Sequence, residues 1–357
     1  MTTWRLLDTG LRPAAQNIAL NRTLLEARQE NASPSTLRFL RFESCALLGY
    51  HQSAEQELNL DYCREHAITI QRRITGGGAI YFDTTQIGWE LYLHKHELGT
   101  ADMSAISRRI CEAAARGIST LGVDARFRPR NDIEVDGRKI SGTGGAFDGD
   151  ALMYQGTLLI EFDVEKMLRV LKIPAEKLSD KAIASARERV ANLGDLLGQV
   201  PPMSQVQAAL ASAFAEEFGV EFAAAPLTPR EETLYQAALA EIDHPDWINL
   251  LARPTADQPT LDAVRKFSGG LLRASMAFDR SQSRIKQVWF SGDVFISPSR
   301  TLADLEAALR DTLAEQLAHN VQHFFAARTV DMLTLTADDF VSVLHEALAQ
   351  ANSEAAA

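Results

Sequence analysis

The sequence predicts a protein of the α+β class, because extended segments and amphipathic helices follow one another without an internal repeat. Segments such as "IGWELYLH" and "LMYQGTLLIEF" are rich in the branched and aromatic residues that strands favour. Residues 103–121 instead repeat apolar side chains every three to four positions, as helices do. At 357 residues, the chain is long enough for two domains or for one large domain with a small appendage, since a common domain has about 100–200 residues.

The first part of the chain alternates between the two kinds of element. Gly219 follows the last apolar position of one stripe, where a helix C-cap is expected, and Pro229 is placed to open the next helix. The expected helices lie at 18–27, 58–67, 103–121, 164–171 and 203–218, and the expected strands at 36–42, 45–50, 68–72, 87–94 and 152–162.

A tight hairpin is expected near the middle of the chain. Ile133 and Val135 alternate before the pair Asp136-Gly137, and Ile140 follows it, which is the pattern of a two-residue β-turn. Lys139 therefore comes just after the turn.

A second module is expected after a segment that carries three prolines, residues 243–260. Residues 269–278 and 284–296 then have the pattern of two strands. Thr301-x-x-Asp304 opens a helix whose leucines continue to Leu317, and Thr336-x-x-Asp339 opens the last helix.

The composition excludes several classes of protein. No apolar run reaches the roughly 20 residues of a membrane helix, and the first residues lack the apolar core of a secretory signal, so a cytoplasmic protein is expected. Cys45, Cys63 and Cys111 lie far apart, with neither disulfide nor zinc spacing. The net charge of -11 argues against general nucleic-acid binding.

The stretch "RRITGGGAIYFD", Arg72 to Asp83, combines two cations with three consecutive glycines. Glycine is costly to order, so the run indicates a place where another molecule comes close to the backbone. Cations also occur in "DGRKISG" and in "DKAIASARERVANL", and together with glycine amides they suit a nucleotide or an acyl phosphate. The spacing matches neither a P-loop nor G-x-G-x-x-G, and solvated cations with a flexible glycine turn remain the alternative.

Taken in order, these segments resemble the lipoate-protein ligase family, which shares its fold group with biotin ligases and octanoyltransferases. The resemblance starts at "QNIALNRTLLEA", is strongest in "RRITGGGAIYFD" and "RNDIEVDGRKISG", and continues through "QGTLLIEFD" to "HPDWIN". It implies a biotin/lipoate ligase-like catalytic domain with a mixed sheet and flanking helices over residues 1–245. A linker at 246–260 and a small C-terminal α/β accessory domain over 261–357 complete the expected organisation.

The resemblance also implies roles for individual residues. Lys139 corresponds to the central catalytic lysine, and Asp132 to a residue near the phosphate and the metal. The lipoate-binding set carried over is Arg73, Gly76, Gly77, Gly78 and Lys139. The adenylate-binding set is Arg73, Gly78, Ala79, Ile80, Tyr81, Asn131, Asp132, Lys139 and Lys181.

The reaction implied by the resemblance is activation of lipoate by ATP and Mg²⁺ to lipoyl-AMP, followed by transfer to a lysine of an acceptor protein. A lysine ammonium at Lys139 would stabilise the negative charge that both steps build on oxygen. The segment 181–192 resembles the loop that closes over the adenylate. The expected partner is an E2 lipoyl domain, a glycine-cleavage H protein or another lipoate-binding protein, and a monomer is expected.

The chain departs from the family pattern at Phe82 and at Tyr154-Gln155, where relatives usually carry histidines. These changes indicate either a particular acceptor preference or reduced activity, so a non-catalytic lipoyl-carrier binding protein stays an alternative. An ATP-independent octanoyl or lipoyl transferase would need a cysteine before the hairpin lysine, where this chain has "RFRPRND". A biotin ligase is disfavoured, because its glycine-arginine loop has a different sequence.

Overall fold

The computed structural model describes residues 2–129, 131–172, 186–251 and 260–353. The chain divides into two compact units. The first consists of Met1–Leu47, Asn59–Gln71 and Ile80–Trp247, and the second of Leu48–Leu58, Arg72–Ala79 and Ile248–Ala357. The second unit therefore combines the C-terminal part of the chain with two short segments of the N-terminal half. The domain bounds expected from the sequence, 1–245 and 261–357, remain a prediction.

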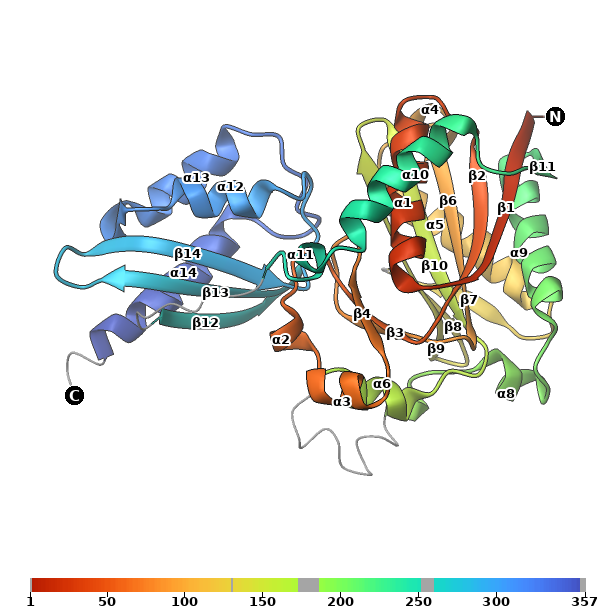
Figure 1. The fold of residues 1–357 in the computed structure, drawn as a ribbon, viewed down its shortest axis with the longest axis horizontal. Coiled ribbons are helices and arrows are strands. Elements are labelled where there is room, and N and C mark those ends of the chain that lie inside the picture. Colours follow the sequence, from red (N-terminus) through yellow and green to blue (C-terminus); the bar gives the residue numbers. More distant parts are fainter. Residues whose placement is uncertain (1, 130, 173–185, 252–259, 354–357) are drawn as a thin grey trace. The chain divides into compact units, whose positions relative to one another are not determined.

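A mixed eight-stranded sheet forms the centre of the first unit, in the order β11-β1-β2-β6-β10-β9-β8-β7 (Figure 1). β1 runs parallel to β2 and β11, and the other neighbouring strands are antiparallel. The strands are β1 (Thr2–Arg12), β2 (Thr36–Phe42), β6 (Gln86–His94), β7 (Ala125–Arg128), β8 (Asp132–Val135), β9 (Arg138–Asp148), β10 (Ala151–Leu159) and β11 (Val220–Ala224). A smaller sheet has the order β4-β3-β5, with β3 (Cys45–Leu48), β4 (Thr69–Arg72) and β5 (Ile80–Phe82). The predicted α+β class with a mixed sheet is confirmed.

Helices cover both faces of the large sheet. Figure 1 shows α1 (Ala14–Gln29) and α10 (Pro229–Ile242) on one face, and α5 (Met103–Ser119) and α9 (Met203–Phe218) on the other. The expected end signals are present: Gly219 caps α9 with a φ of 64°, and Pro229 opens α10 behind a capping box formed by Thr228 and Glu231. The shorter helices are α3 (Leu60–Glu65), α4 (Lys95–Leu98), α6 (Val164–Val170), α8 (Leu193–Leu197) and α11 (Pro245–Ile248).

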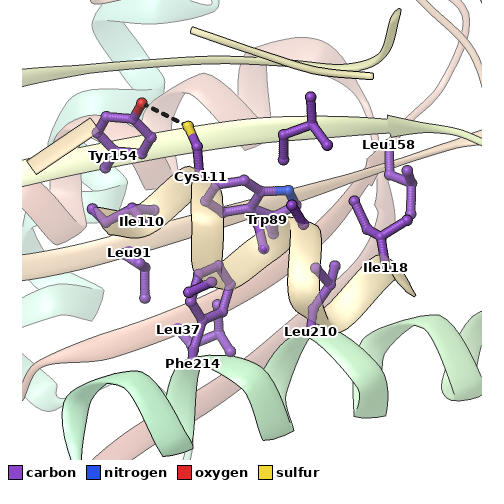
Figure 2. Packing of buried hydrophobic residues seen from close by; sticks show 14 of the residues in the cluster. Leu37, Trp89, Leu91, Ile110, Cys111, Ile118, Tyr154, Leu158, Leu210 and Phe214 are labelled. Atoms are coloured by element: carbon purple, nitrogen blue, oxygen red, sulfur yellow. Dashed lines mark hydrogen bonds between the residues drawn. The ribbon is translucent and has the colours of Figure 1, made fainter. Parts of the chain in front are cut away.

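Trp89 lies at the centre of the core between the sheet and the helices α5 and α9 (Figure 2). Its ring needs the bare backbone of Gly156 on the neighbouring strand, because a Cβ there would lie 2.2 Å from a ring atom. Ile110 and Ile118 of α5 and Phe214 of α9 belong to the same cluster, in which the stripe predicted for 103–121 is buried. This packing fixes α5 beneath β9 and β10.

The second unit is built on a four-stranded antiparallel sheet, in the order β12-β13-β14-β15, with its own hydrophobic core. Its elements are α2 (Ala54–Glu57), β12 (Thr260–Phe267), β13 (Gly270–Asp279), β14 (Arg284–Gly292), α12 (Thr301–Ala308), β15 (Thr312–Leu313), a 3-10 turn η2 (Ala314–Gln316), α13 (Leu317–Ala326) and α14 (Ala337–Ser353). At the start of α14, Asp339 accepts hydrogen bonds from both the backbone amide and the hydroxyl of Thr336, as the sequence motif predicts.

One sequence-based expectation in this unit is wrong. The leucine stripe from Thr301 to Leu317 is not a single helix, because α12 ends at Ala308 and Asp311 takes a φ of 60°. The next two residues form β15, which pairs with Arg284 and Ile285. The local period was helical, but pairing with a sheet edge interrupts it.

Among the helices described, none is both long and apolar enough to cross a membrane.

Candidate functional site

Lys139 lies on a hairpin of the predicted type. Asp136 and Gly137 form the turn between β8 and β9 with φ values of 51° and 74°, so both take the left-handed conformation that a type I′ turn requires. After Lys139 the register shifts by one residue, which makes Ile140 a bulge. The bulge comes directly after Lys139, which itself pairs with Glu134.

The ammonium of Lys139 is held by an acidic side chain on the neighbouring strand. Its Nζ lies 2.7 Å from Oδ1 of Asp132, while the guanidinium of Arg128 lies 2.7 Å from Oδ2 of the same carboxylate. Arg128 also contacts Glu134 at 3.1 Å. The hydrogen bond to Asp132 raises the pKa of Arg128, which therefore stays charged. These four side chains form a row of alternating charge in which both oxygens of Asp132 are occupied.

Gly142 leaves room for the lysine side chain. A Cβ at this position would lie 2.9 Å from Nζ and 3.0 Å from Cε of Lys139, closer than an ordinary contact. The position of the ammonium therefore depends on a missing side chain three residues further along the strand.

The backbone of Lys139 binds the segment that the sequence analysis expected to close over an adenylate. The amide of Lys139 donates to the carbonyl of Arg189, and the amide of Ala191 donates to the carbonyl of Lys139, each at 2.8 Å. One end of the segment 181–192 is thus attached beside the lysine. Lys181, which was expected to contact the adenylate, lies outside the described residues.

Asn131 is fastened to β9 opposite Thr143. The Asn131 carbonyl accepts hydrogen bonds from the amide and the hydroxyl of Thr143, each at 2.9 Å. In return the Nδ2 of Asn131 donates to the carbonyl of Thr143 at 2.7 Å. The chain therefore enters β8 at a fixed point, immediately before Asp132.

The glycine run and Arg73 belong to the second unit. The Arg73 amide donates to the carbonyl of Leu48 at 2.8 Å, and its Nη2 donates to the carbonyls of Gly76 and Gly78 at 3.1 and 2.9 Å. Burial lowers the pKa of Arg73 to about 10, so the guanidinium is still charged at neutral pH. A buried cation thus holds the loop together from inside.

The bare backbone of the glycine run lies against other parts of the second unit. A Cβ at Gly76 would come within 2.2 Å of the carbonyl oxygen of Val294, and one at Gly77 within 2.8 Å of the ring of Phe295. Gly77 also has a φ of 93°, and a Cβ at Gly49 would lie 1.8 Å from its carbonyl oxygen. Glycine is required here by packing within the protein itself.

Arg72, the other cation of the opening stretch, is fully buried and binds backbone carbonyls. Its Nη1 donates to those of Gly49, Tyr50 and Gln52, and its Nη2 to that of Ile248. Burial lowers the pKa of Arg72 to about 10. Arg72 therefore stabilises the fold of the second unit.

The residues after the glycine run form β5 in the first unit. Ile80 and Tyr81 pair with Leu47 and Ala46, and Tyr81 is buried. Phe82 is also buried, with its ring 4.7 Å from that of Phe42, so it is a core residue.

Asp83, the last residue of the stretch "RRITGGGAIYFD", caps the turn that follows β5. It accepts hydrogen bonds from the backbone amide and the hydroxyl of Thr85 at 2.9 and 2.6 Å.

The candidate residues thus fall into two groups. Asn131, Asp132 and Lys139 are linked to one another in the first unit, which also contains Ile80 and Tyr81. Arg73, Gly76, Gly77, Gly78 and Ala79 are in the second unit. The roles expected for them in binding lipoate and adenylate remain predictions.

No group of three or more His, Cys, Asp or Glu side chains suited to a metal ion is found within the described ranges. Asp132, the expected metal contact, already binds two cationic side chains. A Mg²⁺ ion at this carboxylate would have to displace one of them.

An open groove of about 640 Å³ lies between α5 and β7 in the first unit. It is lined by Glu112, Ala115, Arg116, Ser119, Thr120, Ala125, Arg126 and Phe127, none of which is a candidate residue. Its volume alone therefore identifies no site.

Three residues that contact Lys139 or its neighbours Asp132 and Asn131 were not found from the sequence. Arg128 could have been found from the alternation in "ARFR", which matches a strand. The importance of Gly142 and Thr143 depends on which strands pair, and no local signal shows that.

Comparison with known proteins identifies the family. A sequence model described as the lipoyl protein ligase A/B catalytic domain matches residues 13–215, more than half of the chain. The chain therefore belongs to the lipoyl protein ligase A/B family.

Two relatives differ in the reaction that their names state. Lipoate-protein ligase A subunit 1 of Thermoplasma acidophilum is 33% identical over 208 residues, 56% of this chain and 78% of the relative. Octanoyltransferase LipM of Moorella thermoacetica is 25% identical over 266 residues, 69% of this chain and 97% of the relative. The chain is thus an enzyme-family member whose similarity extends to both ligases and transferases.

Solved structures agree with the family. A lipoate-protein ligase A bound with ATP aligns with a TM-score of 0.61 and 28% identity, covering 70% of this chain and 98% of its own. A bi-partite lipoate protein ligase and its E2 lipoyl domain from T. acidophilum gives 0.62 and 29%, covering 72% and 100%. LipL1 of P. falciparum in complex with lipoate covers 92% of this chain and 95% of its own, with a TM-score of 0.71 at 17% identity, and shows the shared fold.

Proposed function

We propose that this protein is an ATP-dependent lipoate-protein ligase. In the first step a lipoate carboxylate oxygen attacks the α-phosphorus of ATP, so that an O–P bond forms and pyrophosphate leaves. In the second step a lysine amine of the acceptor attacks the carbonyl carbon of lipoyl-AMP, forms the amide with loss of a proton, and releases AMP. Mg²⁺ would offset the triphosphate charge and help pyrophosphate leave.

The observation that carries the proposal is the Lys139 ammonium, held on the β8–β9 hairpin by Asp132. Both steps build negative charge on oxygen, and a cation placed in advance stabilises it without reorganising. Asp132 orients the lysine, and Arg128 shares the same carboxylate. Because Asp132 is shared, it neutralises Lys139 only in part and leaves charge for the reacting oxygen.

A cysteine-dependent transferase is the second candidate, favoured by the similarity to LipM over most of the chain. The chain has three cysteines and none lies between Ala125 and Lys139. Cys45, Cys63 and Cys111 are all buried, and burial raises the pKa of each thiol. A raised pKa keeps a thiol protonated and unreactive, which supports the ligase over the transferase.

The third alternative is a lipoyl-carrier binding protein without turnover. The departures at Phe82 and Gln155 motivated it. Phe82 packs in the core against Phe42, which accounts for an apolar residue there, so this departure by itself does not argue for lost turnover.

The expected acceptor is an E2 lipoyl domain, such as the one named with the T. acidophilum ligase above, a glycine-cleavage H protein or another lipoate-binding protein. We also propose that the protein acts as a cytoplasmic monomer.

Incubation of the purified protein with lipoate, ATP, Mg²⁺ and a panel of lipoyl domains, followed by mass measurement of each acceptor, separates the three candidates. A mass gain that requires ATP supports the ligase. A gain from octanoyl carrier protein without ATP would establish the transferase, and no gain with either donor would leave binding alone.

Lys139→Ala tests the role of the lysine. Arg138→Ala is its matched control, because it removes the neighbouring cation of the same strand. We expect Lys139→Ala to lower the rate of lipoyl-AMP formation by at least about 100-fold, since that is the usual effect of removing one group that stabilises an oxyanion. Undiminished adenylate formation in a folded Lys139→Ala protein would disprove the role of the lysine.

A further inference from the structure

Three polar side chains lie buried beneath the lysine hairpin, inside an otherwise apolar core. Cys111 comes from α5, Thr143 from β9 and Tyr154 from β10, and all three are buried. The Cys111 sulfur lies 3.2 Å from the Thr143 hydroxyl and 3.3 Å from the Tyr154 hydroxyl, and the two hydroxyls are 2.9 Å apart (Figure 2 shows the Cys111–Tyr154 contact). The three groups therefore contact one another in a closed cluster.

The direction of these hydrogen bonds follows from counting protons. The Thr143 hydroxyl has one proton and donates it to the carbonyl of Asn131, which can only accept. The Thr143 oxygen can then accept from the Tyr154 hydroxyl, which also interacts with Ser107, and the Cys111 thiol can donate to either hydroxyl oxygen. Burial raises the pKa of Tyr154 and of Cys111, so both keep their protons. The cluster is a one-way chain of donors that ends on Asn131.

Asn131 is where this chain of hydrogen bonds reaches the proposed site. Its carbonyl accepts from two groups of Thr143, and the next residue is Asp132, which holds Lys139 at 2.7 Å. Hydrogen bonds that polarise one another in a low-dielectric interior hold their acceptor more firmly than isolated ones.

We propose that Thr143, supported by Tyr154 and Cys111, is a positioning residue for Lys139. The proposal rests on the proposed ligase function. The Thr143 hydroxyl sets the position of Asn131, Asn131 sets that of Asp132, and Asp132 sets that of the ammonium. None of the three buried groups takes part in the chemistry.

If Thr143 only filled space in the core, a residue of the same shape should replace it without loss of activity. Valine has nearly the shape of threonine and would fill the same space, but it would remove both the hydroxyl that donates to Asn131 and the oxygen that faces the buried Tyr154 hydroxyl. Serine keeps the hydroxyl and loses only a methyl group. The pair Thr143→Val and Thr143→Ser therefore separates the hydrogen bond from the packing.

The test measures lipoyl-AMP formation at varied ATP and lipoate in the full chain. We expect Thr143→Val to lower kcat about tenfold with little change in KM, since one hydrogen bond corresponds to about that factor. Thr143→Ser should restore kcat to within about twofold, and Tyr154→Phe should give an intermediate loss. Equal rates for Thr143→Val and Thr143→Ser would overturn the proposal.

Two further readouts distinguish positioning from loss of fold. In a Lys139→Ala background, Thr143→Val should have no further effect on the rate, because it acts through the lysine. A full additional loss there would contradict the proposal. Amide exchange at Thr143 and over Asp132–Val135 should rise in Thr143→Val and not in Thr143→Ser.

The exchange measurement does not depend on catalysis. If the wild-type protein forms no lipoyl-AMP, the proposed function fails, and exchange alone decides on the positioning role. Identical exchange in the two Thr143 variants would then refute it.

Discussion

Gly142 offers the sharpest test of the idea that the position of Lys139 matters. In Gly142→Ala the new Cβ would lie 2.9 Å from the lysine Nζ. To reach an ordinary contact of 3.4–4 Å, the ammonium must move by about 0.5–1 Å. Only the far end of a flexible side chain has to shift, so the fold should survive.

The expected loss can be estimated from that displacement. A misplacement of about 1 Å can lower the rate of an enzyme about 100-fold, so we expect Gly142→Ala to lose between about 10- and 100-fold. The φ of Gly142 is outside the left-handed region, and alanine at such a position changes the free energy of unfolding by less than about 1 kcal/mol. Activity should therefore fall while stability hardly changes.

The assay is ATP-dependent formation of lipoyl-AMP, together with thermal unfolding of the same samples. Gly144→Ala is the matched control, because it lies on the same strand and a Cβ there has no described atom within 4 Å. Activity of Gly142→Ala within about twofold of wild type would refute the reasoning, as would an equal loss in Gly144→Ala.

Two further predictions concern the second unit. Gly77→Ala should lower the free energy of unfolding by about 1–3 kcal/mol, because the φ of 93° and the Phe295 ring both oppose a Cβ. Gly78→Ala is the control and should be nearly neutral in thermal unfolding, because the nearest atom to its Cβ would lie 3.8 Å away. Burial raises the pKa of Glu306 from 4.5 to about 7, so the folded protein holds this proton more tightly than the unfolded chain, and stability falls as pH rises from 4.5 through about 7. Glu306→Gln keeps the acceptor for the Phe290 amide and should remove this loss of stability, which is at most about 3 kcal/mol. Denaturant unfolding of both proteins at pH of about 5 and about 8 measures the loss. A pH dependence that is unchanged in Glu306→Gln would contradict the prediction.

Much of the fold could be predicted because its signals are local. The Asp136-Gly137 turn, the Gly219 cap and the amphipathic stripe of α5 each depend on residues close in sequence, and all three are confirmed. The strand β7 was missed although its four residues alternate apolar and charged side chains, because so short a run is a weak signal.

The site was predictable only in part. The motif around Lys139 identified the lysine, but not the partners that hold it. Strand pairing brings Asp132 to the lysine and Arg128 to Asp132. Pairing of β9 with β10 likewise brings Thr143 to Tyr154. Such contacts depend on the register of the sheet, which a single sequence does not contain.

The glycine run shows why a bare backbone cannot by itself identify a ligand site. Three adjacent glycines indicated that another group approaches the backbone closely, and within the second unit Val294 and Phe295 are such groups. Arg73, expected to face an activated carboxyl, binds the carbonyls of Gly76 and Gly78. A carboxylate that reaches Arg73 must compete with these two carbonyls, and the charge that it brings favours the exchange, because a hydrogen bond between two ions is stronger than one to a neutral oxygen. The loop can therefore be packed in the absence of a ligand, while Arg73 can still bind an anionic group.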